Sequence, residues 1–384
     1  MPTSRRSATA SDRPTSAGGA VGAPAAGALV LAVLALASSL AHAEPGPAAA
    51  GRCLRHGAIV MGTVLQVTVC GEGAVGAAER ILAEAAREEA IFSRYQSSSA
   101  VSALAARAGR PPRSVPPELL DVLRRAERLR RLTRGAFDVT VGPLVDLWRG
   151  ATSVPSPGRI ERVRALVGAL VLTADGRVGL PRPGMSVDLG GIAKGYALDR
   201  AAAGLHGASA LLDFGQSSFR AIGRPPDGPT WNLIVRGPGG DAIALVALRD
   251  RALSVSASFG RSREIEGRRF GHVIDPRTGH PVSAERVAAV VATSATEAEG
   301  LSTALVVAGR EGLAAVEQVA GAEALLVERR RGAARRRWRT SGWREAVAGR
   351  VAPPASAGGR RLGRDEDGAE LPRGIGRGRP AELG

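Results

Sequence analysis

Apolar and polar residues alternate along residues 54–69, and this alternation predicts the first ordered part of the chain. Apolar side chains recur at every second position on either side of Met61 and Gly62, which is typical of two strands that pair as a hairpin or lie in adjacent positions of a sheet. Residues 75–93 and 117–133 carry apolar residues at helical spacing, and prolines precede the second segment where a first helical turn tolerates them. The pattern therefore predicts a pair of strands followed by two helices.

The middle of the chain continues to mix helices and short strands, without an internal repeat. Residues 135–148 predict a turn, an extended piece and the start of a helix, and residues 158–181 predict a mixture of helix and short strand. Residues 187–189 predict a short extended piece. A Gly-Gly turn separates this piece from a helix that begins at Ile192.

Two later segments present polar side chains from defined backbone positions. Residues 269–282 predict a strand followed by a turn with Asp-Pro and Thr-Gly pairs. Residues 294–309 predict a helix capped by Ser294, and Glu297 three residues later completes a capping-box pattern.

The start of the chain has the composition of an export signal. Three arginines precede an apolar run at residues 25–43, which ends in small residues around His42. We expect residues 1–43 to be a signal peptide cleaved after Ala43, and the mature chain to lie in the periplasm. An uncleaved membrane anchor is the alternative, and the choice between the Sec and twin-arginine routes stays open.

The formal net charge of +16 raises the question of nucleic-acid binding. Residues 328–384 contribute a net +8, with fifteen arginines and seven acidic residues in a stretch rich in Gly and Pro. Such a composition is too poor in apolar residues to order itself, so we expect a disordered tail at 349–384. The rest of the chain has no basic stripe interleaved with aromatic residues, so we predict no nucleic-acid partner.

Two cysteines, Cys53 and Cys70, flank the predicted strand pair. In an oxidising compartment they could form a disulfide, which would contribute roughly 3 kcal/mol for a loop of this length. Two unpaired thiols are the alternative, because strand geometry could hold the Cα atoms too far apart.

Lys194 is the only lysine of the chain, and it lies three residues after the Gly-Gly turn. Glycines let a ligand approach the backbone, and the helix N-terminus after them offers free N–H groups and positive charge, which suits a phosphate. A compact ammonium group in the first turn could neutralise diphosphate oxygens. The alternative is a tight turn between a strand and a helix with a solvated lysine.

Three further groups of side chains could carry chemistry. His272 could titrate near neutrality and serve as an acid or base, although a hydrogen-bonded strand residue is the more common case. Asp275 lies in the turn that follows. Glu299 and Thr303 are four residues apart on one helical face, and two oxygen ligands of this kind suit Mg²⁺ or Ca²⁺ when water or phosphate completes the shell. The alternative is a solvated glutamate and a threonine bonded to its own helix.

Seven segments, in this order, resemble the successive motifs of the ApbE-type flavin transferases, the FAD:protein FMN transferases. They are MGTVLQVTV (61–69), FSRYQSSSAVSAL (92–104), GAFDVTVGPLVDLW (135–148), VDLGGIAKGYALDR (187–200), LLDFGQSSFRAIG (211–223), FGHVIDPRTGHPV (270–282) and TEAEGLSTALVVAG (296–309). The resemblance runs from about residue 55 to about residue 344 and leaves out the leader and the tail.

This resemblance implies a Mg²⁺-dependent transfer of FMN from FAD to a threonine hydroxyl of a target protein, with release of AMP. The acceptor would be a membrane-associated respiratory protein on the outer face of the cytoplasmic membrane. The implied fold is α+β: two intertwined halves of largely antiparallel sheet with packed helices, in a single catalytic domain at residues 44–348.

The resemblance also assigns roles to individual residues. Mg²⁺ would be held by the backbone carbonyl of Ala193 and the side chains of Glu299 and Thr303. Catalysis would involve His272, Lys194 and Asp275. The FAD site would be lined by Met61, Tyr95, Ala136, Phe137, Asp138, Asp188 and Lys194.

Three departures from the family pattern bear on these roles. The family usually has Asp where this chain has Glu299, and Ala where it has Gly300, which could make room for the longer carboxylate. Gln216 stands where many members have Gly. An FAD pyrophosphatase that releases free FMN and AMP, or an FAD-binding protein without turnover, are therefore the alternatives to a transferase.

Overall fold

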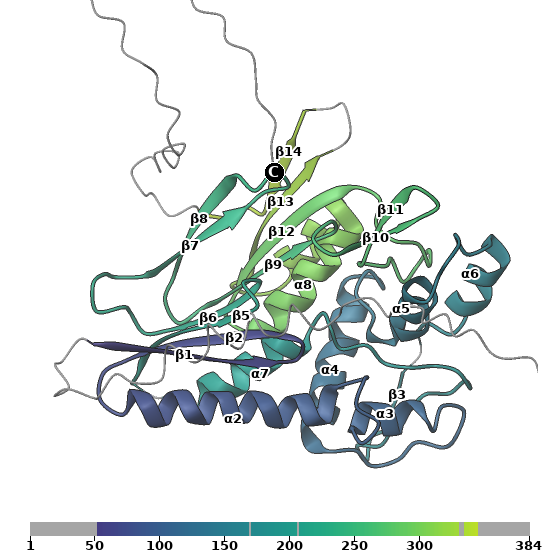
Figure 1. Ribbon diagram of the computed structural model, residues 1–384, viewed down its shortest axis with the longest axis horizontal. Coiled ribbons are helices and arrows are strands. Elements are labelled where there is room, and N and C mark those ends of the chain that lie inside the picture. The colour runs from purple at the N-terminus through teal and green to yellow at the C-terminus, as the bar shows by residue number, and fades with distance from the viewer. Residues whose placement is uncertain (1–51, 169, 206, 330–333, 345–384) are drawn as a thin grey trace, which may run out of the picture. The chain divides into compact units, whose positions relative to one another are not determined.

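An antiparallel sheet of eight strands forms the centre of the fold, in the order β1-β2-β5-β6-β9-β12-β13-β14 (Figure 1). The strands are β1 (Cys53–Val60), β2 (Thr63–Cys70), β5 (Ser209–Phe214), β6 (Ser218–Ile222), β9 (Ala252–Ala257), β12 (Glu285–Ala292), β13 (Glu323–Arg329) and β14 (Arg336–Arg339). The β1-to-β6 half and the β9-to-β14 half join where Ser218 pairs with Ser254 and Phe219 with Leu253. The predicted class, helices packed on a largely antiparallel sheet, is confirmed.

The computed structural model describes residues 52–168, 170–205, 207–329 and 334–344. The predicted signal peptide and the predicted tail lie outside the described residues. The described residues from Cys53 onward belong to one compact unit.

Both faces of the sheet are covered, which explains why β12 is an almost continuous apolar run. Ala288, Val290 and Ala292 point into a core shared with the helices. The alternate residues of β12 point into a second core, under the hairpin of β7 (Trp231–Arg236) and β8 (Ala242–Leu248). The sheet therefore separates two apolar layers.

Three helices pack on the face of the sheet that borders this shared core (Figure 1), and two of them, α7 and α8, carry Ala193, Lys194, Glu299 and Thr303. Helix α2 (Ala74–Phe92) lies against β1 and β2, α7 (Ala193–Ala203) against β5 and β6, and α8 (Ala295–Ala308) against β9 and β12. Most residues of α8 are buried, because α4 (Pro117–Leu132) and α7 also pack against it. Within the described ranges, none of the helices is long and apolar enough to cross a membrane.

The smaller elements connect these layers. They are α3 (Ala100–Ala105), α5 (Gly142–Arg149), α6 (Pro157–Arg164), α9 (Leu313–Glu317), the 3-10 helices η2 (Val139–Val141) and η3 (Gly309–Gly312), and the strand pairs β3 (Val171–Leu172) with β4 (Val178–Gly179) and β10 (Ser262–Ile265) with β11 (Arg268–Gly271). The helices predicted at 75–93, 117–133 and 294–309 are confirmed as α2, α4 and α8.

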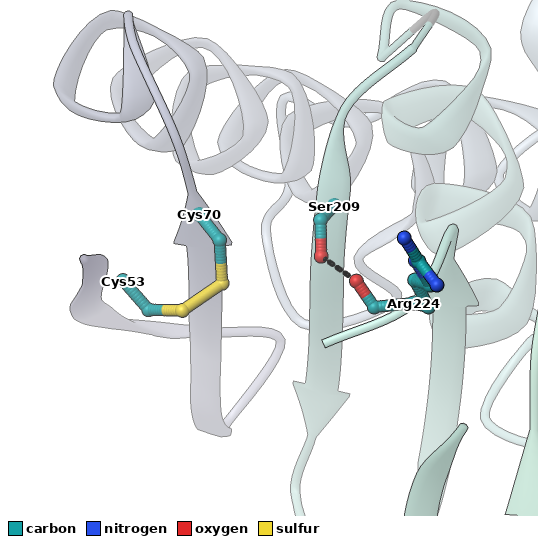
Figure 2. Close-up of a disulfide and its surroundings, with 4 residues drawn as sticks. All are labelled: Cys53, Cys70, Ser209 and Arg224. Atoms are coloured by element: carbon teal, nitrogen blue, oxygen red, sulfur yellow. Dashed lines mark hydrogen bonds between the residues drawn. A yellow bond between two sulfur atoms is a disulfide. The ribbon is translucent and has the colours of Figure 1, made fainter. Parts of the chain in front are cut away.

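The predicted strand pair is a hairpin, and a disulfide closes its open end (Figure 2). Met61 and Gly62 both have positive φ, 50° and 71°, as a two-residue turn matched to the twist of a hairpin requires. This register places Cys53 directly opposite Cys70, and the two are bonded. The disulfide that the sequence left open is therefore present.

One predicted extended piece is wrong, and another forms no part of a sheet. Residues Val139–Val141 form a 3-10 helix, because the Asp138 carboxylate accepts hydrogen bonds from both the N–H and the hydroxyl of Thr140, at 2.8 and 2.6 Å. Residues 187–189 belong to no strand. Instead, the Asp188 N–H donates to the Val139 carbonyl at 2.7 Å.

Candidate functional site

The first turns of α7 and α8 meet, and glycines permit the close approach. A Cβ atom at Gly195 would lie 2.3 Å from the Ala295 carbonyl oxygen. A Cβ at Gly191 would lie 3.1 Å from Thr303 Oγ1 and 3.2 Å from the Phe137 ring. Three sequence motifs that are far apart along the chain therefore converge at the Gly-Gly turn.

The Glu299 carboxylate is the centre of this convergence, and it is almost completely buried, at 2% exposure. It forms an ion pair with the Lys194 ammonium group. It also accepts hydrogen bonds from the Gly195 N–H at 2.6 Å and the Ser218 hydroxyl at 3.2 Å. The Gly195 N–H lies in the first turn of α7, where N–H groups lack helical partners and a negative charge is favoured.

A row of hydroxyl groups continues the polar cluster toward β9. The Ser302 hydroxyl lies 3.0 Å from that of Ser254 and 2.7 Å from that of Ser256. The Ser256 hydroxyl lies 3.5 Å from Thr303 Oγ1. The sequence reasoning assigned no role to the two β9 serines.

The donor set at this place suits Mg²⁺. Glu299 supplies a carboxylate, Thr303 a hydroxyl one turn later, and Ala193 a carbonyl at the start of α7 beside Lys194 and Gly195. All three are hard oxygen donors, and Mg²⁺ takes one or two carboxylates with water and phosphate oxygens. Among the described residues no three His, Cys, Asp or Glu side chains form a metal-binding group, so water or substrate oxygens would complete the shell.

Positive charge gathers around the buried carboxylate. Burial lowers the pKa of Lys194 to about 8, and the positive charge of Arg261 adds to this effect. Burial also lowers the pKa of His272, and the charges of Arg261 and Lys194 act in the same direction. His272 is an exposed residue, and its Nδ1 lies 2.9 Å from the Arg261 carbonyl oxygen. The structure thus brings His272 close to Lys194, with its imidazole favoured in the neutral form.

Asp275 is held in its turn rather than in the Glu299 cluster. Its carboxylate accepts two hydrogen bonds from the Arg277 guanidinium, at 2.9 and 2.8 Å, and one from the Arg277 N–H. A Cβ at Gly135 would lie 3.8 Å from Arg277 Cγ, so this turn lies beside the segment that contains Ala136, Phe137 and Asp138. Its catalytic role stays a prediction.

Arg94, which the sequence reasoning missed, connects several predicted FAD-site residues. Its guanidinium binds the carboxylates of Asp188 and Asp146, each at 2.6 Å. The other Asp188 oxygen accepts the Gly190 N–H at 2.8 Å. Arg94 therefore fixes Asp188, which lies just before the Gly-Gly turn. Its position next to Tyr95 in the same motif is the sequence feature that could have identified it.

The remaining predicted FAD-site residues differ in exposure. Tyr95 is 69% exposed, with the Arg149 guanidinium 4.8 Å from the centre of its ring. Ala136, Phe137 and Asp138 are buried, and burial raises the pKa of Asp138 against the opposing hydrogen bonds from Thr140. The exposed Tyr95 ring can therefore contact a flat ligand, whereas the Asp138 carboxylate is already bound to Thr140.

Met61 lies at the tip of the β1–β2 hairpin, beside the tip of the next hairpin. The Gly215 N–H donates to the Val64 carbonyl at 2.8 Å, which joins the two tips. Gln216 has a φ of 55°, a conformation that favours glycine. This backbone explains why glycine is common there, and Asp213 stabilises the turn by accepting the Gln216 N–H at 2.7 Å.

Comparison with known protein sequences shows a match to one family. The sequence profile of the ApbE family matches residues 61–326, a range that contains every predicted site residue. The FAD:protein FMN transferase of Salmonella typhimurium is 32% identical over 282 residues, which cover 66% of this chain and 81% of that protein.

Solved structures agree with the sequence match. The ApbE protein of Thermotoga maritima superposes with a TM-score of 0.68 at 30% identity, covering 74% of this chain and 97% of that one. The flavin transferase ApbE of Vibrio cholerae gives a TM-score of 0.67 at 25% identity, covering 76% of this chain and 97% of that one. The fold and the sequence thus both match the α+β proteins of the ApbE type. The chain belongs to the ApbE family.

Proposed function

We propose that the chain is a FAD:protein FMN transferase, which moves FMN from FAD to a threonine hydroxyl of a target protein and releases AMP. The observation that carries the proposal is the Glu299 cluster at the start of α7, where the buried Glu299 carboxylate binds both the Lys194 ammonium group and the Gly195 N–H. It is supported by relatives from Salmonella typhimurium and Vibrio cholerae, which are FAD:protein FMN transferases.

The proposed reaction requires positioning and charge neutralisation more than covalent chemistry. The acceptor oxygen bonds to the FMN phosphorus, the anhydride bond to the adenylate breaks, and AMP leaves with the bridging oxygen. Lys194 binds diphosphate oxygens beside the α7 N-terminus. His272, whose pKa is lowered, is neutral at pH 7 and accepts the hydroxyl proton. Asp275 fixes the turn after His272 through its hydrogen bonds with Arg277.

Mg²⁺ belongs to the same proposal. When bound, it would neutralise phosphate charge, with Ala193, Glu299 and Thr303 as its protein ligands. Met61, Tyr95 and Asp188 would contact the FAD, and Arg94 would hold Asp188 in place. We further propose that the mature chain works in the periplasm on a membrane-associated respiratory protein, because the sequence begins with the pattern of an export signal.

The test uses the mature chain from Glu44, incubated with FAD, Mg²⁺ and a periplasmic extract. Flavin fluorescence on a denaturing gel reports covalent attachment, and chromatography measures AMP and free FMN. We expect a fluorescent protein band that requires Mg²⁺ and is lost in Glu299→Ala. The matched control is Glu297→Ala, which removes an acid of the same helix that pairs with Arg128 at 3.4 Å and should leave the band.

Two other outcomes would indicate a different function. AMP with free FMN and no labelled band, even with a purified acceptor, would indicate an FAD pyrophosphatase. Bound FAD without AMP at any Mg²⁺ concentration would indicate a flavin-binding protein without turnover.

A further inference from the structure

Asp199, in the last part of α7, closes the N-terminus of a different helix. Its carboxylate accepts the backbone N–H groups of Ala295 and Thr296, the first two residues of α8, at 2.8 and 2.9 Å. It also accepts the hydroxyl groups of Ser294 and Thr296, at 2.6 and 2.7 Å. Four hydrogen bonds from one carboxylate thus fix the start of α8 to α7.

Glu299 makes the opposite connection, from α8 to the start of α7. It lies four residues after Ala295, and it binds the N–H of Gly195. Asp199 lies four residues after Gly195, and it binds the N–H of Ala295. Each helix therefore supplies an acid that binds the N–H located four residues before the acid of the other helix. We call this pair of connections the reciprocal clasp.

The clasp acts where the two helices are closest. A Cβ at Gly195 would meet the Ala295 carbonyl at 2.3 Å, so the helices can neither separate nor slide along each other without breaking these hydrogen bonds. Ala193 and Lys194 belong to α7, and Glu299 and Thr303 belong to α8. The distance between the two sets of candidate ligands depends on this crossing.

We propose that Asp199 is a positioning residue for the metal end of the site: it fixes the register of α7 against α8 and thereby holds the Ala193 carbonyl beside Glu299 and Thr303. This inference rests on the proposed function, in which these residues hold Mg²⁺. Asp199 itself contacts the α8 backbone and hydroxyl groups, so it acts through Glu299 and not on the substrate.

The surroundings of Asp199 make the test practical. Asp199 and Ser294 line a surface hollow of about 360 Å³, together with Arg125 and Arg220. Water can enter such a hollow and bind the N–H groups released by a substitution, so the variants should fold with a modest fall in melting temperature. Asp199→Ala removes all four hydrogen bonds, and Asp199→Asn keeps one side-chain acceptor oxygen.

The other end of α8 provides a matched control. The Arg286 guanidinium donates to the carbonyls of Val306 and Val307, at 2.9 and 3.0 Å, and pairs with Glu328 at 2.7 Å. Arg286→Gln therefore weakens the same helix at its C-terminus, well away from the clasp. Any effect of Asp199 that only reflects a less stable α8 should appear in this variant too.

Two readouts are independent of turnover and use the full mature chain. Mn²⁺ binding is measured by electron paramagnetic resonance with FAD present and no acceptor protein. Hydrogen exchange of the Gly195 amide reports directly on its bond to Glu299. We expect Asp199→Ala to weaken Mn²⁺ binding and to speed Gly195 exchange, each at least tenfold, with Asp199→Asn in between and Arg286→Gln within twofold of the unmodified chain.

Equal effects of Asp199→Ala and Arg286→Gln on both readouts would overturn the proposal and leave Asp199 as a helix cap only. If the unmodified chain binds no Mn²⁺, the metal part of the proposed function fails, and Gly195 exchange alone decides the role of Asp199. If the chain binds Mn²⁺ but transfers no FMN, the proposed function fails, while both readouts still decide the role of Asp199.

Discussion

The single lysine of the chain occupies a place that a guanidinium would fill poorly. The Lys194 ammonium shares the Glu299 carboxylate with the Gly195 N–H, and its side chain is only 19% exposed. An ammonium is a compact charge with three rotatable donors, whereas a guanidinium is a wide planar group. In a chain whose other basic residues are all arginine, the tight first turn of α7 therefore explains the exception.

The lowered pKa of Lys194 predicts a limit to FAD binding in alkaline solution. Because the pKa is about 8, Lys194 loses its charge through pH 8 to 9 and attracts the diphosphate less. We expect the FAD dissociation constant to rise about fivefold across this unit of pH. Equilibrium binding, followed by flavin fluorescence from pH 6.5 to 9, measures it. Lys194→Met should bind weakly at all these pH values, and an equal rise in that variant would assign the change to another group.

Gly300 makes room for a neighbouring helix and not, as the sequence suggested, for the Glu299 carboxylate. A Cβ at Gly300 would lie 2.5 Å from Cδ1 of Leu129 in α4, and Leu129 is buried at 3% exposure. The glycine that is unusual for the family therefore compensates for a large side chain on α4.

This packing predicts a change of sign in a double-mutant experiment. Gly300→Ala gains about 1 kcal/mol of helix propensity but overpacks the core by about 1–3 kcal/mol, so we expect a net loss of up to about 2 kcal/mol. In a Leu129→Ala background the overpacking disappears, and the same substitution should stabilise the protein. Urea denaturation of the four proteins measures both steps, and equal effects in the two backgrounds would contradict the packing argument.

At the scale of elements, the contact between α2 and α7 contains a buried acid that is poorly solvated. Glu88 of α2 is 1% exposed, and within the described residues neither of its carboxylate oxygens has a hydrogen-bond partner. Arg200 of α7 approaches one oxygen at 3.5 Å. Burial raises the pKa of Glu88 to about 7, although the charge of Arg200 opposes the shift.

Glu88 should therefore make the fold less stable as the pH rises. Between pH 4.5 and about 7 the folded chain keeps a proton that the unfolded chain has released, so the free energy of unfolding falls with pH and levels off above about 7. The full effect is about 3 kcal/mol. Glu88→Gln removes it. Urea denaturation should show a variant that is more stable by only about 1 kcal/mol at pH 5 and by about 3 kcal/mol at pH 8, and a constant difference would refute this account.

For the whole molecule, local patterns predicted the elements better than the contacts between them. Turn glycines, alternation and helical spacing predicted the pair of strands around Met61 and the helices α2, α4 and α8, because these depend on neighbouring residues. The 3-10 helix after Asp138 was not predicted, because it depends on a hydrogen bond from the Thr140 N–H to the Asp138 side chain.

The partners within the site were less accessible to sequence reasoning. The contact between Glu299 and Lys194 joins residues 105 positions apart, and the bonds of Asp199 to α8 span nearly as far. No local pattern encodes such pairs. Helical spacing grouped Glu299 with Thr303, but only the resemblance to a family added Ala193. Neither assigned a role to Arg94, Asp199 or Ser218, which bind Asp188, the start of α8 and Glu299.

The contacts of Thr340 and Trp343 predict how much of the C-terminal region is required for folding. Trp343 is buried at 5% exposure in the core under β7 and β8, and Thr340 exchanges backbone and side-chain hydrogen bonds with Ala324 of β13. Residues 345–384 lie beyond these contacts and beyond the family match, which ends at residue 326.

We therefore expect a mature chain that ends after Arg344 to keep its unfolding free energy within about 0.5 kcal/mol, together with its FAD affinity. A chain that ends after Arg329 loses β14 and exposes part of the second core, and should unfold at least about 3 kcal/mol more easily. Urea denaturation and FAD binding compare the two. A large loss in the longer chain would mean that residues 345–384 are part of the folded enzyme and not an appendage to it.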